Sequence, residues 1–268
     1  IGTLTVALLP RAKHVLSIER DPDLPAVLDE TCDDFDNFTL IGKDALRLND
    51  DDLIAAFGKQ TVEASEAPNK FISNLPYAVA ATLVLDYFQR IPSLQSATVM
   101  VQSEVADRME AVVGTKDYAA YSVKLQLIAK ATGRFQVSPG NFFPPPRVDS
   151  AVIRLNRRVP LMADGAPASP EVIAAAALMA DAAFTNRRKT IANSCKTYFS
   201  GRGPISLGAG PSAQEGAPGI VLPDGAAIAE RLAAIFDAAT IDPRRRGETL
   251  TQQEFLALGA ALLKVTAA

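Results

Sequence analysis

The sequence has few of the side chains that bind metals or form disulfides. It contains one histidine, His14, and two cysteines, Cys32 and Cys195, which lie far apart in the chain. These three residues cannot supply the ligand spacing of a common zinc site. Isolated cysteines without paired spacing are typical of proteins in a reducing compartment. We therefore expect free thiols, no bound metal and a cytoplasmic protein.

An excess of positive charge is also lacking. The chain has 27 basic and 30 acidic residues, a formal net charge of -3. No apolar run approaches the roughly 18 residues of a membrane-spanning helix. Without a basic field over the whole chain, any contact with nucleic acid depends on local clusters. Two such clusters are Arg187-Arg188-Lys189 and Arg244-Arg245-Arg246.

Short apolar segments alternate with segments of helical spacing over the first 157 residues. Strands are predicted at residues 14–18, 38–41, 70–73 and 97–102, and helices at 1–9, 22–33 and 79–90. This alternation predicts an α/β domain with a mainly parallel sheet. Residues 134–137 and 151–155 are predicted to close the domain as a strand pair with a proline-rich loop between them.

The composition changes near Arg157. Residues 160–170, rich in Pro, Gly and Ala, predict a linker, and residues 201–223 predict a long loop. Helices are predicted at 171–184, 226–239 and 252–264, the last with a capping box between Thr251 and Glu254. We therefore divide the chain into an α/β domain, residues 1–157, and a small helical domain, residues 158–268.

Acidic residues follow two of the predicted strands. Glu19 ends the first strand and Asp44 comes shortly after the second. Ligands of parallel sheets bind outside the carboxyl ends of the strands. A carboxylate at the first end can accept hydrogen bonds from both hydroxyls of a ribose, and one at the second end can accept from the amino group of adenine. The pair predicts a cofactor that contains adenosine, either a dinucleotide or S-adenosylmethionine.

The motif Asn74-Leu75-Pro76-Tyr77 distinguishes these two cofactors. The amino nitrogen of adenine is a poor nucleophile. The Asn74 side chain and the carbonyl of Leu75 or Pro76 can accept its hydrogens as positive charge develops during methyl transfer. Pro76 fixes the backbone, and the Tyr77 ring offers a stacking face worth about 1–3 kcal/mol per base. The chemistry of a dinucleotide oxidoreductase does not use this motif, so the motif favours S-adenosylmethionine. Because only the ring face is used, Tyr77→Phe is expected to be nearly neutral.

With this motif the sequence resembles the ribosomal RNA adenine dimethyltransferases. Residues 74–77 match that family's catalytic motif, and residues 141–152 and 184–190 resemble two further hallmarks. Residues 18–21 and 42–45 match its cofactor motifs, and the resemblance runs from Ile1 to about Ser194. It implies a class I methyltransferase (Rossmann-like) domain followed by a small all-helical C-terminal domain.

The resemblance also implies roles for individual residues. S-adenosylmethionine would contact Gly2, Glu19, Asp44, Ala45 and Asn74. The target adenine would meet Asn74, Leu75, Pro76 and Tyr77, with Phe142 on the other side of the flipped base. Phosphates of the RNA would meet Arg147, Arg187, Arg188 and Lys189.

The implied activity is dimethylation of two adjacent adenines in a hairpin of small-subunit (16S) ribosomal RNA. The expected partner is an immature small ribosomal subunit, and we expect the enzyme to be a monomer. Only Gly2 remains of the family's glycine-rich loop, so we expect that a segment before Ile1, with the first strand, is missing from this sequence. Two alternatives remain open: a 23S ribosomal RNA adenine methyltransferase of the macrolide-resistance type, and a ribosome-assembly factor that acts mainly by binding.

Overall fold

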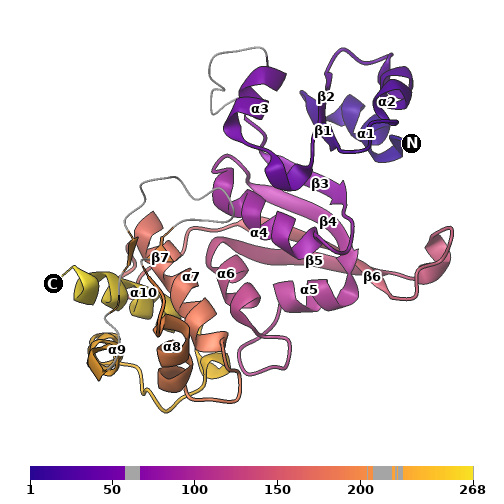
Figure 1. Cartoon of the computed structure of the whole chain (residues 1–268). Helices are drawn as coiled ribbons and strands as arrows, with labels where there is room; N and C mark the ends of the chain where they lie inside the picture. Colours follow the sequence, from indigo (N-terminus) through magenta and orange to yellow (C-terminus); the bar gives the residue numbers. More distant parts are fainter. Residues whose placement is uncertain (58–66, 204, 208–218, 221, 223–225, 268) are drawn as a thin grey trace. The chain divides into compact units, whose positions relative to one another are not determined.

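The computed structural model describes residues 1–57, 67–203, 205–207, 219–220, 222 and 226–267 (Figure 1). The chain forms two compact units, residues 1–73 and 74–268. The domain boundary predicted between residues 157 and 158 lies within the second unit. The position of this domain boundary therefore stays a prediction.

A parallel pair of strands forms the centre of the first unit. β1 (Val15–Glu19) and β2 (Phe38–Gly42) pair from Val15 opposite Phe38 to Glu19 opposite Gly42. The helical elements of this unit are α1 (Thr3–Leu8), η1 (Leu9–Arg11), α2 (Pro25–Cys32), η2 (Ala45–Arg47) and α3 (Asp50–Ala56). Buried Leu9, Val15 and Cys32 form a small core between them. The two predicted strands are confirmed, and their carboxyl ends lie at one edge.

The sheet of the second unit is antiparallel. Three strands lie side by side in the order β4 (Ser96–Gln102), β6 (Ser150–Arg157) and β5 (Ala129–Val137). The expectation of a mainly parallel sheet is therefore wrong, and the chain has a mixed α/β fold. The physical reason is the predicted closing strand pair, which is confirmed: β6 runs back from the proline-rich loop and inserts between β5 and β4.

Three helices accompany this sheet: α4 (Ala80–Arg90), α5 (Ser103–Met109) and α6 (Ala120–Ile128). The apolar spacing that predicts α4 buries Leu83, Val84 and Phe88. β3 (Lys70–Asn74) precedes α4 along the chain, and the first unit ends within it. The last residue of β3, Asn74, and the three residues that follow it carry the predicted catalytic motif.

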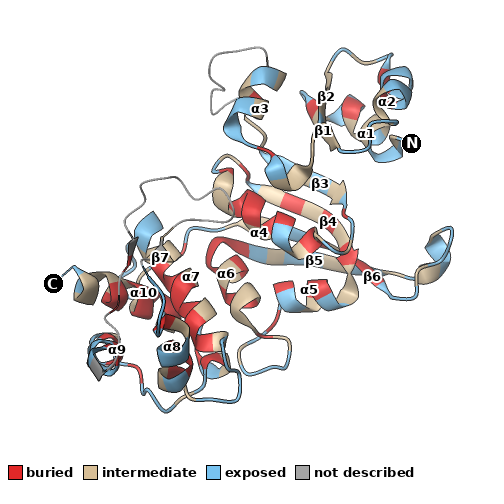
Figure 2. Ribbon diagram, viewed as in Figure 1, coloured by how far each residue is buried: buried red, intermediate tan, exposed pale blue. Residues whose placement is uncertain are grey.

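The C-terminal part of the second unit is built from helices. They are α7 (Pro170–Phe184), α8 (Ile191–Phe199), α9 (Ala226–Ala238), α10 (Gln252–Thr266) and the short η5 (Gly247–Thr249). Buried residues run along α7 and α10 (Figure 2). These two helices approach closely, since a Cβ added to Gly259 would lie 2.6 Å from the Ala176 backbone nitrogen. The capping box of Thr251 and Glu254 at the start of α10 is confirmed.

The predicted loop at residues 201–223 contains a short strand pair. β7 (Ile205–Ser206) and β8 (Gly219–Ile220) pair antiparallel. Residues 204, 208–218, 221 and 223 of this segment lie outside the described residues. The described residues from 170 onward thus form helices, loops and this strand pair.

Candidate active site

The two predicted strand-end carboxylates lie at the same edge of the first unit. Glu19 is the last residue of β1, and its carboxylate accepts the backbone amide of Asp21 at 2.8 Å. Asp44 caps η2 directly after β2 and accepts the amide of Leu46 at 3.0 Å. Both side chains are half-buried. Local backbone contacts therefore hold each carboxylate at an end of the parallel pair.

An ion pair that the sequence analysis missed braces the segment after β2. Lys43 lies 2.6 Å and 2.8 Å from the two carboxylate oxygens of Asp52. Asp52 also forms a reciprocal capping box with Asn49 at the start of α3. The hydrogen bond from Lys43 lowers the pKa of the Asp52 carboxyl below its usual value. The spacing of Asn49 and Asp52, which resembles a capping box, was the signal in the sequence.

Gly2 and Ala45 occupy the starts of short helices in the first unit. Gly2 precedes α1 with φ of 75°, in the left-handed region that favours glycine. A Cβ at this position would lie 3.2 Å from Leu28 Cδ2 and 3.3 Å from Thr31 Cγ2 of α2. Ala45 begins η2 immediately after Asp44.

The motif between β3 and α4 combines fixed residues with one exposed side chain. The Leu75 side chain is buried, and its amide donates to the Met100 carbonyl of β4 at 3.2 Å. The Pro76 carbonyl accepts the amide of Val79 at 3.1 Å, which turns the chain into α4. Asn74 is exposed, and within the described part of the chain no residue hydrogen-bonds to its side chain. The amide of Asn74 is thus available to a ligand.

The two predicted base-stacking rings belong to different segments. The Tyr77 hydroxyl lies 2.5 Å from Ser150 Oγ, at the first residue of β6. Half-buried Phe142 follows η3 (Pro139–Asn141) in the loop between β5 and β6, and its amide donates to the Pro139 carbonyl at 3.1 Å. No ring contact joins Tyr77 and Phe142 among the described aromatic pairs. The Tyr77–Ser150 contact ties the catalytic motif to the end of the loop that carries Phe142.

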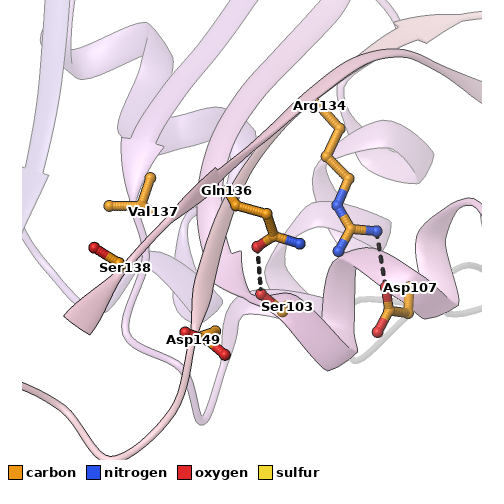
Figure 3. A pocket seen from close by; sticks show the side chains of 7 residues that line it. All are labelled: Ser103, Asp107, Arg134, Gln136, Val137, Ser138 and Asp149. Carbon is orange, nitrogen blue, oxygen red and sulfur yellow. Dashed lines mark hydrogen bonds and ion pairs between the residues drawn. The ribbon is translucent and has the colours of Figure 1, made fainter.

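A polar pocket of about 310 Å³ adjoins this loop (Figure 3). Its walls come from α5, β5 and the residues that flank the loop. They are Ser103, Asp107, Arg134, Gln136, Val137, Ser138 and Asp149. Sequence reasoning missed this pocket because its residues are scattered over 47 positions and α5 was not predicted. Only Asp149 lies within a motif that the sequence analysis singled out.

The three residues of the first basic cluster differ in their contacts. Arg187 donates from Nε to Glu248 at 2.8 Å and from Nη2 to the Thr115 carbonyl at 3.0 Å. Its Nη1 donates to the carbonyl of Lys116. Arg188 and Lys189 are exposed, and no hydrogen bond or ion pair of either side chain is found in the described chain. Arg187 thus holds the turn between α7 and α8, whereas its neighbours face solvent.

The second basic cluster lies beside the first. The Ile191 amide at the start of α8 donates to the Arg245 carbonyl at 2.7 Å. Arg245 pairs with Glu254, and Arg244 pairs with Asp242. Arg246 is exposed, and so is Arg147 in the loop between β5 and β6. The fold therefore places two basic segments that are distant in sequence next to each other.

Other candidate chemistry in the chain is sparse. The Nε2 atom of His14 lies 2.9 Å from the hydroxyl oxygen of Thr39, at the entry to the strand pair. Cys32 and Cys195 are free and buried, and burial raises the pKa of both thiols. Over the residues with a described placement, no cluster of three His, Cys, Asp or Glu could hold a metal ion. Of the helices in that same part, none combines the length and apolar character needed to cross a membrane.

Comparison with known proteins identifies the family. Residues 1–203 match the model of the ribosomal RNA adenine dimethylase family. A ribosomal RNA small subunit methyltransferase A from Geobacillus thermodenitrificans is 34% identical over 264 residues, which cover 98% of this chain and 78% of that protein. A protein of the same name from Anaeromyxobacter dehalogenans is also 34% identical, over 98% of this chain and 80% of its own. The chain belongs to the ribosomal RNA adenine dimethylase family.

Solved structures support the fold. A dimethyladenosine transferase from Plasmodium falciparum superimposes with a TM-score of 0.68 at 20% identity, over 98% of this chain and 87% of that chain. The 23S rRNA methyltransferase ErmE gives 0.57 at 22% identity, over 97% and 86%. The predicted methyltransferase fold with a helical C-terminal part is thereby confirmed.

Proposed function

We propose that the chain transfers methyl groups from S-adenosylmethionine to the N6 atoms of two adjacent adenines in a small-subunit ribosomal RNA hairpin. Its membership of the adenine dimethylase family and its small-subunit relatives support this substrate. The observation that carries the proposal is the exposed side-chain amide of Asn74, which hydrogen-bonds to no described residue, beside the fixed Leu75 and Tyr77.

The residues at the strand ends fit the proposed cofactor. Glu19 and Asp44 offer carboxylate oxygens at one edge, and such acceptors suit the hydroxyls of a ribose and the amino group of an adenine. Ala45 would lie beside the adenine, and Gly2 would close on the methionine part. When bound, S-adenosylmethionine supplies a methyl group on a positively charged sulfur. The strand-end residues hold and orient it.

Asn74 would act on the target amino group. Its side-chain oxygen and the Leu75 carbonyl would accept hydrogen bonds from the N6 amino group. The Pro76 carbonyl already accepts a hydrogen bond from the backbone amide of Val79. Fixed acceptors stabilise the positive charge that develops on nitrogen, and they need no reorganisation during the reaction. Asn74 would also border the cofactor. No strong base is required, because the nitrogen is cationic and acidic once it is methylated and can lose its proton to water.

The RNA would be held by rings and by phosphates. Tyr77 and Phe142 would grip the flipped adenine from two sides. Arg147, Arg188 and Lys189 would contact phosphates, which position an RNA without reading its sequence. Arg187 would orient the turn that carries its two neighbours, because its own guanidinium is engaged.

On this proposal residues 1–157 form the methyltransferase domain and residues 158–268 a helical domain that contacts RNA. The physiological partner would be an immature small ribosomal subunit in the cytoplasm, and the enzyme would act as a monomer. The same basic surfaces also serve the alternative in which binding during assembly matters more than catalysis.

The test compares two substrates. Immature small subunits and protein-free 23S RNA are each incubated with the protein and S-adenosylmethionine, and the digested nucleosides are analysed by mass spectrometry. The proposal predicts N6,N6-dimethyladenosine in small-subunit RNA alone. Product in 23S RNA alone supports the macrolide-resistance alternative. Tight binding to small subunits without any product supports the assembly-factor alternative.

A further inference from the structure

The hydroxyl group of Tyr77 has a specific partner. Its Oη lies 2.5 Å from the Oγ of Ser150, and Ser150 is 0% exposed. Stacking against a base uses only the face of the ring, so stacking alone gives this hydroxyl no role. A buried hydroxyl that loses its partner costs free energy. The hydrogen bond therefore restrains the Tyr77 ring, and replacing either residue leaves the hydroxyl of the other without this partner.

Ser150 is itself held on several sides. It lies opposite Gln102 of β4 and Val137 of β5 in the sheet. The amide nitrogen of Gln136 lies 2.9 Å from the Ser150 carbonyl when the amide is oriented to match donors with acceptors. The backbone carbonyl of the preceding residue, Asp149, accepts a hydrogen bond from the backbone amide of Ser103 at 3.0 Å. Ser150 is thus fixed before it meets Tyr77.

The network continues to α5 through two side chains of β5. In the same orientation, the Gln136 amide oxygen accepts Arg134 Nη2 at 3.0 Å. Arg134 is paired with Asp107 at 2.8 Å and with Glu110. Figure 3 shows Arg134 and Gln136 on one strand, with Asp107 and Ser103 of α5 beside them. A series of polar contacts leads from α5 to the Tyr77 ring.

We propose that Ser150 is a positioning residue, whose hydroxyl fixes the Tyr77 ring plane on which the target adenine stacks. Gln136 in turn fixes Ser150. This inference rests on the proposed function and reverses the expectation that Tyr77→Phe is nearly neutral. Since a small misplacement of a reacting base lowers the rate, the hydrogen bond should matter for methyl transfer as well as for stability.

A double-mutant cycle in the full-length protein tests the proposal. Tyr77→Phe and Ser150→Ala should each lower the single-turnover methyl transfer rate about 3- to 10-fold, the size of one neutral hydrogen bond. Because both changes remove the same bond, the double variant should be no slower than the slower single variant. Chemical unfolding of the four proteins should show the same coupling.

Matched controls separate positioning from stability. Tyr118→Phe removes a buried hydroxyl that donates to the Leu250 carbonyl at 2.9 Å, and Ser122→Ala removes one that donates to the Asp117 carbonyl at 3.2 Å. Both should lower the unfolding midpoint and leave the transfer rate unchanged. A parental rate in Ser150→Ala, or rate losses that multiply in the double variant, would overturn the positioning role. If the unfolding experiments show the coupling but the unmutated protein methylates no RNA, the proposed function would be contradicted and the Tyr77–Ser150 contact would remain.

Discussion

In two short segments of the second unit, some residues contact the rest of the protein while their sequence neighbours are exposed. In the segment at residues 74–77, Leu75 is buried and Tyr77 is bonded to Ser150, while the Asn74 amide is exposed. In the turn at residues 187–189, Arg187 makes three contacts within the protein, while Arg188 and Lys189 face solvent.

The comparison teaches that residue type alone does not identify the residue that meets a ligand. The three basic side chains of the turn carry the same charge, yet one braces the structure. In the catalytic motif the bracing residues are apolar or aromatic, and the acting residue is polar. A functional assay and a stability assay should therefore separate the members of each segment.

The largest expected effect is on the chemical step. Asn74→Ala should lower the transfer rate by about 100- to 1000-fold, or roughly 2.7–4 kcal/mol, the loss typical of one preorganised polar group. Its stability should be unchanged because the side chain is exposed. Single-turnover kinetics and thermal unfolding of the same preparation measure the two quantities. A destabilised variant would place Asn74 among the bracing residues and break the comparison.

Arg187→Ala should act mainly on stability. Loss of its bonds to Glu248 and to the two loop carbonyls should lower the free energy of unfolding by about 1.5 kcal/mol. This is the low end for charged hydrogen bonds, because the side chain is 41% exposed. Denaturant unfolding measures the change, with Arg188→Ala as the control expected to be neutral. Equal stability of the two variants would remove the distinction between them.

Arg188 and Lys189 should act on RNA affinity through salt. Each phosphate contact contributes about 0.7–0.9 to the slope of log affinity against log salt. The double variant Arg188→Ala/Lys189→Ala should therefore flatten that slope by about 1.5 and leave unfolding unchanged. Filter binding of small-subunit RNA across a salt series gives the slope. An unaltered slope would make this turn an ordinary solvated surface.

The smallest expected effect concerns the brace in the first unit. The hydrogen bond from Lys43 lowers the pKa of Asp52 in the folded state. Its stabilisation is therefore present above the unfolded pKa of about 3.9 and is lost as the pH falls through the folded pKa. Asp52→Asn should cost about 1 kcal/mol at pH 7, and less as the solution is acidified towards pH 3. Denaturant unfolding at both values checks this, and a gap that widens on acidification would contradict it.

Much of the fold follows from local pattern. Strands such as Val15–Glu19 are short, apolar and followed by polar residues, so their positions could be predicted. Helices α5 and α6 could not, because they lack clear apolar periodicity and start without a strong side-chain cap. The antiparallel direction of β6 was also not predicted, since strand direction depends on how the chain returns and periodicity carries no such information.

Some residues of the candidate site could be predicted from the sequence in the same way, and others could not. Asn74 and Tyr77 are recognisable because an unusual motif follows a strand. The partner that fixes Tyr77 is not, because Ser150 is 73 positions away and a hydrogen bond over that separation leaves no local signal. Likewise Glu248 is 61 positions from Arg187, so the brace in the basic turn was invisible in the sequence.

The most direct test of this division of work compares Asn74→Ala with Tyr77→Ala in rate and RNA affinity, each measured on one preparation. Asn74 is proposed to act mainly in the transition state, so its loss should lower the rate at saturating RNA and leave the Kd within about twofold. Tyr77 is proposed to stack on the base in both states, so its loss should also weaken binding, by up to about 1–3 kcal/mol. An Asn74→Ala protein that methylates at the parental rate would contradict the account.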